Sequence, residues 1–140
     1  MIKKKANILF TLLILVILAW VVKDTFTQAT VTDLKGGFTE KAIYRNDNNT
    51  GPVQRIYSVS VKDPDQADLT AYGNFMPHTK YGNTKVYFFK EGGPIPTILY
   101  PGEVNFDAVY KENCIALYEK SAMGNYGIIV QPFKQTQKIQ

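Results

Sequence analysis

The chain has 140 residues, enough for one small domain, and it carries a net charge of +4 at pH 7 with a single cysteine. The positive charge is local, because residues 1–22 hold three lysines and no acid, while the remaining residues hold 13 basic and 12 acidic side chains. With only two arginines, Arg45 and Arg55, this near-neutral remainder argues against a nucleic-acid surface. One cysteine excludes an internal disulfide.

The first predicted element is an apolar helix. Residues 6–22 (ANILFTLLILVILAWVV) carry no charge, and twelve of the seventeen are Ile, Leu, Val or Phe. As a helix this stretch is about 25 Å long, close to a hydrocarbon core of ~30 Å. Its apolar side chains favour insertion by roughly 4–7 kcal/mol. The stretch therefore predicts a single transmembrane helix whose partner is the lipid bilayer.

The flanks of this helix predict its orientation. The side chains expected to anchor it at the two membrane surfaces are Lys3, Lys4, Lys5, Trp20 and Lys23. Lysines before the first span place the N-terminus in the cytoplasm and the rest of the chain outside it; if the source is a bacterium, this is the periplasm or the cell surface. The alternative is a cleaved signal peptide. Signal peptides have apolar runs of ~7–15 residues followed closely by a small-x-small site. Here the run has seventeen residues and no such site follows it closely, so we expect the helix to be retained.

The remainder predicts a connector over residues 23–37, a folded domain over residues 38–134 and a polar tail over residues 135–140. In this domain Phe38–Tyr44 and Val53–Val61 are predicted strands, and the turn-forming residues between them favour a hairpin. The second strand alternates apolar residues with glutamine and serine, so we expect it to be buried on one face only.

A helix is predicted after this hairpin. Asp63 is the expected N-cap, with Pro64 at the first helical position and Gln66 completing a capping box. Because Pro77 disfavours a helical conformation at the residue before it, the helix should end by about Phe75.

Five further segments follow. Thr84–Lys90 is apolar on both faces and is predicted to be a central strand, and Ile95–Tyr100 is predicted to be a strand after a turn. Val104–Tyr110 is read as a strand, with a short helix as the alternative. Cys114–Glu119 and Tyr126–Gln131 are predicted to form a closing hairpin. The fold class is therefore α+β, a mainly antiparallel sheet with one packed helix.

The sequence offers few residues for chemistry. Residues 46–51 (NDNNTG) superficially resemble the start of a calcium loop, but Tyr57 stands where the bidentate glutamate is required, and a hairpin turn explains the same residues. The acidic residues 63–68 have a structural role at the predicted helix start. We therefore expect no metal, cofactor or catalytic residue.

His78 and Cys114 are the only residues of their kinds and form the one conceivable thiol dyad. A strand cysteine usually acts as a small buried hydrophobe, and a histidine after a helix usually lies in a solvated loop. A thiol-dependent enzyme is thus the third hypothesis for function.

Exposed tyrosines give the positive indication of function, because tyrosine is favoured at interfaces. The candidates are Tyr81, Tyr100, Tyr110 and Tyr126. The first hypothesis is an anchored interaction module that is not an enzyme, an accessory or structural subunit of a membrane or cell-envelope assembly with a protein partner. The second is an anchored or secreted domain that binds a small ligand.

Overall fold

The computed structural model describes residues 1–27 and 30–134 and divides into two compact units, Met1–Thr30 and Val31–Gln140. The predicted polar tail, residues 135–140, lies outside the described residues. The second unit begins before the predicted domain boundary at Phe38, because Val31 and Leu34 pack against its core. A short 3-10 helix, η1 (Val31–Asp33), lies in this segment.

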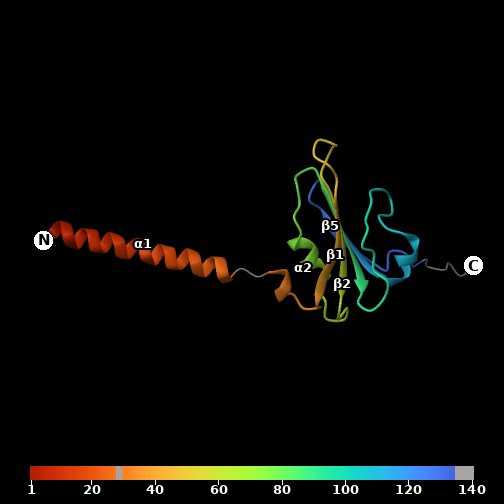
Figure 1. The fold of residues 1–140 in the computed structure, drawn as a ribbon, viewed down its shortest axis with the longest axis horizontal. Helices are drawn as coiled ribbons and strands as arrows, with labels where there is room; N and C mark the ends of the chain where they lie inside the picture. The colour runs from red at the N-terminus through yellow and green to blue at the C-terminus, as the bar shows by residue number, and fades with distance from the viewer. Residues whose placement is uncertain (28–29, 135–140) are drawn as a thin grey trace, which may run out of the picture. The chain divides into compact units, whose positions relative to one another are not determined.

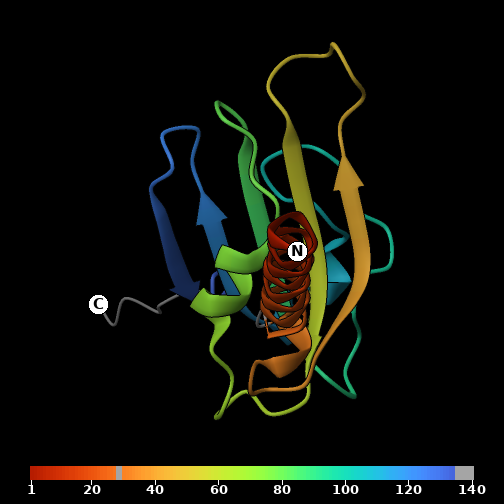
Figure 2. The same ribbon diagram turned by 90° about the vertical axis from the view of Figure 1, so that its left-hand side faces the viewer.

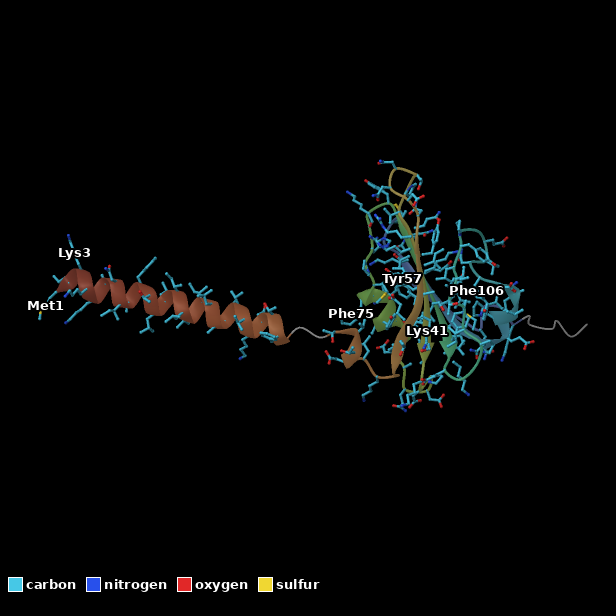
Figure 3. The ribbon with its side chains drawn as sticks, viewed as in Figure 1. Met1, Lys3, Lys41, Tyr57, Phe75 and Phe106 are labelled. Carbon is cyan, nitrogen blue, oxygen red and sulfur yellow. The ribbon has the colours of Figure 1, made fainter. Side chains whose placement is uncertain are left out.

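The first unit consists of helix α1 (Ile2–Thr27). Ile2–Phe26 contains an 18-residue stretch with a mean hydropathy of 2.4 and is long and apolar enough to cross a membrane. No residue from Met1 to Phe26 is buried, and Figure 3 shows side chains projecting all around the helix. α1 thus continues past the predicted end of the apolar stretch, through the polar residues that follow Val22.

The second unit is built on a five-stranded sheet (Figure 1). The strands lie in chain order across the sheet: β1 (Phe38–Arg45), β2 (Gln54–Val61), β3 (Asn83–Lys90), β4 (Cys114–Lys120) and β5 (Tyr126–Val130). Neighbouring strands are antiparallel except β2 and β3, which are parallel and are connected through helix α2 (Leu69–Phe75). The predicted α+β class, both hairpins and the central position of β3 are confirmed.

The predicted start of this helix is wrong. Asp68, not Asp63, is the N-cap, and its side chain accepts a hydrogen bond of 2.9 Å from the backbone N–H of Ala71. Asp63 instead donates its backbone N–H to the carbonyl of Gly36 at 2.9 Å. Residues 64–66 form a turn, closed by the backbone N–H of Gln66 donating to the carbonyl of Asp63 at 3.3 Å, and the helix begins after it. The predicted end at Phe75 is confirmed.

Each face of the sheet carries its own core. On one face, residues of α2 and of the segment before β1 pack over a cluster made of Tyr57, Val59, Val61, Tyr72, Val86, Phe88, Ala116 and Tyr118. On the other, the segment 91–113 packs over Ile56, Tyr87, Phe89, Leu99, Phe106, Cys114 and Leu117. Figures 1 and 3 show the two layers on opposite sides of the sheet, with Phe75 in one and Phe106 in the other.

Because both faces are covered, β2 is buried on both, and the prediction of a half-buried strand is wrong. Ser58, expected to face solvent, is fully buried and donates its hydroxyl to the carbonyl of Pro96 at 2.9 Å.

The strands predicted at Ile95–Tyr100 and Val104–Tyr110 are also wrong. Residues 91–107 are irregular, and the 3-10 helix η2 (Ala108–Asn113) follows, so the short-helix alternative is nearer to the structure. A buried asparagine organises this segment: Asn105 accepts the hydroxyl hydrogen of Tyr87 at 2.7 Å and donates to the carbonyls of Tyr100 and Gly102. These side-chain hydrogen bonds replace those of a strand ladder.

Candidate functional site

Three connections meet at one end of the sheet, which we name the loop end: residues 46–53, 76–82 and 121–125. Strand register requires this, because β1 and β4 finish where β2, β3 and β5 begin. The three loops lie together at the top of Figure 2. The chain enters β1 at Phe38, at the opposite end of an eight-residue strand about 23 Å long.

The first loop is closed by its own side chains. Asn46 donates to the hydroxyl of Thr50 and the carbonyl of Pro52, and its side-chain oxygen accepts from the backbone N–H of Gln54 at 2.8 Å. The side-chain oxygen of Asn48 accepts from Arg45 at 3.2 Å. These oxygens are used in the turn, which supports the hairpin interpretation over a calcium loop. No group of His, Cys, Asp and Glu side chains suited to a metal lies within the described residues.

The second loop presents a tyrosine in a strained conformation. Tyr81 has φ of 65° and is 64% exposed, although this backbone region disfavours bulky side chains. The next residue must be glycine, because a Cβ at Gly82 would lie 2.4 Å from the carbonyl oxygen of Val53. Lys80 lies over the Tyr81 ring at 5.2 Å from its centroid. The strain is retained at a side chain that contacts solvent, which is typical of functional positions.

Open hollows border these loops, among them two that we name the strand hollow and the basic hollow. The strand hollow, of about 410 Å³, lies over β3, β4 and β5 and is lined by residues including Lys85, Glu119, Asn125, Gly127 and Ile129. The basic hollow, of about 580 Å³, is lined by His78, Lys80, Tyr81, Lys120, Ala122, Met123 and Gly124. Lys85 and Glu119 form an ion pair at 3.5 Å, whereas no acidic residue lines the basic hollow.

His78 is a neutral, half-buried histidine. Its Nδ1 lies 3.0 Å from the hydroxyl of Thr84, and that hydroxyl donates to the carbonyl of Pro77 at 3.3 Å. Nε2 is buried without a hydrogen-bond partner. Burial lowers the pKa of His78, and the charges of Lys120 and Arg55 lower it further, while the Ser121 backbone acts in the opposite direction.

Cys114 lies away from this site. It pairs with Phe89 at the far end of β3, whereas His78 contacts Thr84 at the near end, about 17 Å along the strand. The thiol is buried, and burial raises its pKa to about 12, so it is protonated at neutral pH. The structure does not bring the two residues of the thiol dyad together.

The predicted interface tyrosines occupy different places. Tyr81 and Tyr126 lie at the loop end, and Tyr126 is 55% exposed and stacks on Tyr118. Tyr100 is exposed on the 91–113 segment, and Tyr110 is half-buried against its core. The predicted anchor residues all lie on α1. Met123, which is 83% exposed beside Tyr81 in the basic hollow, was missed by sequence reasoning, because strand order alone brings the two together.

Comparison of the chain with protein families, with curated proteins and with solved structures finds no significant match. The case for a function therefore rests on the apolar helix and the loop end.

Proposed function

We propose that the chain is a single-pass membrane protein with its N-terminus in the cytoplasm and its domain outside. In this proposal the domain is an interaction module, an accessory subunit of a membrane or cell-envelope assembly. The observation that carries it is α1, whose apolar side chains are exposed on every face. A helix that is apolar all round is stable only when it is covered, and a bilayer covers it completely. Lys3, Lys4 and Lys5 support the orientation.

The loop end is the proposed contact surface. It combines exposed aromatic and methionine side chains with lysines, a composition favoured where a partner covers apolar surface. It lies at the opposite end of the sheet from Phe38, the residue where the chain enters β1.

The small-ligand alternative is supported by the volumes of the two hollows, which fall within the ~300–1,000 Å³ of ligand pockets. Both are open depressions rather than enclosed cavities, and this favours a partner surface over a small molecule.

Co-purification tests this function. A tagged full-length chain, extracted from its native membranes in a mild detergent, should bring down a larger membrane or envelope protein identified by mass spectrometry. Tyr81→Asn should lose that protein while keeping the fold, because asparagine tolerates φ above zero. The matched control is Ile98→Asn in the segment 91–113, away from the loop end. Ile98 is 76% exposed, and this variant should still bring down the partner protein.

A chain that is a lone monomer in every mild detergent, together with a small molecule that binds in a hollow, would replace this proposal by the alternative. Loss of the partner in both variants would place the contact elsewhere.

A further inference from the structure

The two edges of the sheet differ in how they are protected. β1 carries Glu40, Lys41 and Arg45, and its register shifts between Glu40 and Ala42. Charged side chains and bulges are the devices that keep an edge strand from pairing with another chain. β5 (YGIIV) has neither, because it is uncharged and pairs regularly with β4.

The backbone groups on the open side of β5 can be assigned. Ser121 donates its N–H to the carbonyl of Asn125, and Gln131 donates its N–H to the carbonyl of Ile115, so the odd-numbered residues of β5 face β4. Since these directions alternate along a strand, the N–H and C=O groups of Tyr126, Ile128 and Val130 point outward. No described element pairs with that side of β5.

We propose that β5 pairs antiparallel with β5 of a second copy of this chain, about a twofold axis at Ile128. In this register Ile128 lies opposite Ile128 of the second copy, and Tyr126 lies opposite Val130. All three outward-facing residues of each strand then meet outward-facing residues of the other, as the hydrogen-bonded positions of an antiparallel ladder require. The result is one continuous sheet across two copies, with an isologous interface.

The side chains are compatible with this register. Tyr126 beside Val130 is an aromatic and β-branched pair, the kind that stabilises antiparallel strands. Ile129 of the second copy lies opposite Gly127, where the space above the backbone is open because no atom lies within 4 Å of the position a Cβ would take. That isoleucine would lie next to the strand hollow, which Gly127 and Ile129 line.

Charge and size favour a second copy as the occupant. No charged residue lies within β5, so two identical strands meet without repulsion. Five residues give a contact about 17 Å long, smaller than interfaces that bury the ~1,200 Å² of stable complexes. A weak contact of this kind suits copies held in one bilayer, where tethering raises the effective concentration; this last step rests on the proposed membrane anchor.

Paired cysteine substitutions test the register. Tyr126→Cys and Val130→Cys, each in the full-length chain, are purified separately, mixed, reconstituted in phosphatidylcholine vesicles and oxidised with copper phenanthroline. Opposed residues of a hydrogen-bonded pair have Cα atoms ~5.5 Å apart, within disulfide range. In either variant alone the two new cysteines lie about 14 Å apart along the strands, so neither can cross-link. Both positions are exposed, and Cys114 is buried.

The expected result is a disulfide-linked dimer in the mixture of the two variants and no such dimer in samples of either variant alone. A second change, Ile129→Lys in both variants, should abolish the cross-link, whereas the matched change Ile43→Lys on β1, at a similarly exposed position, should leave it. Near-UV circular dichroism checks that each variant is folded. No dimer in the mixture, or equal cross-linking in single variants, would overturn the proposed pairing. Sedimentation with the vesicles is scored separately, so failure of the anchor is distinguished from failure of the pairing.

Discussion

Gly73 allows α2 to approach the sheet closely. A Cβ at this residue would lie 2.3–2.6 Å from ring atoms of Tyr118, whereas ordinary van der Waals contact is 3.4–4 Å. The Tyr118 ring cannot move easily, because it is fully buried, its hydroxyl donates to Asn74 at 2.7 Å, and it stacks on Tyr126. Gly73→Ala must therefore displace the helix from the sheet.

The sign of the effect follows from two opposing contributions. Alanine is favoured over glycine inside a helix by about 1 kcal/mol, whereas overpacking a core costs about 1–3 kcal/mol. The shift required here places the cost at the upper end of that range, and we expect Gly73→Ala to lower the free energy of unfolding by about 2 kcal/mol. For a domain of about 100 residues this lowers Tm by roughly 10 °C.

Thermal unfolding of the full-length chain in dodecyl maltoside measures this effect through the near-UV signal of the tyrosines, none of which lies in α1. The matched control is Gly127→Ala, where no atom lies within 4 Å of the new Cβ and the change should be neutral or slightly stabilising. A Gly73→Ala variant that melts at or above the wild-type temperature would refute the packing of α2 described here.

Three further predictions concern the cap, the histidine and the thiol. Asp68→Ala should lower the free energy of unfolding by ~1 kcal/mol, within about 0.5–2, and Asp63→Ala should lower it by less. Urea titrations that give the reverse order would show that the helix is capped by Asp63 instead. Because the pKa of His78 is lowered from 6.5 in the folded state, the unfolded chain binds the proton more tightly, and stability should fall as the pH drops through about 6.5. His78→Gln should flatten that dependence in urea titrations between pH 5 and 8, and an unchanged slope would assign it to other groups. Cys114 should resist maleimide at pH 8 until the domain unfolds, and fast labelling of the folded chain would contradict a buried thiol.

Several elements were predictable because their signals are local. The uncharged run Ala6–Val22 predicts a helix from composition alone, and Val86–Phe89 predicts a central strand because an apolar residue at every position needs cover on both faces. The turn before Gln54 is closed by hydrogen bonds among residues close in sequence, so its hairpin could be predicted as well.

Other features depend on contacts between distant segments. Asp63 and Asp68 are both competent caps by sequence, and in the folded chain Asp68 is the N-cap, while the backbone of Asp63 bonds to Gly36, a residue distant in sequence. Ile95–Tyr100 has the composition of a strand, but this segment lies over the sheet as a covering layer, where the buried side chain of Asn105 accepts the Tyr87 hydroxyl and bonds the loop carbonyls.

The candidate surfaces divide in the same way. The sequence by itself determined that the chain has an apolar helix and a small tyrosine-rich α+β domain, since these follow from composition and from short-range periodicity. It could not place Tyr81 beside Met123, nor show that β5 has an open, uncharged edge. Both depend on strand order, and the parallel pairing of β2 with β3 through α2 sets that order. Strand order is decided by the burial of both sheet faces at once, a cooperative property of the whole domain that no local stretch encodes.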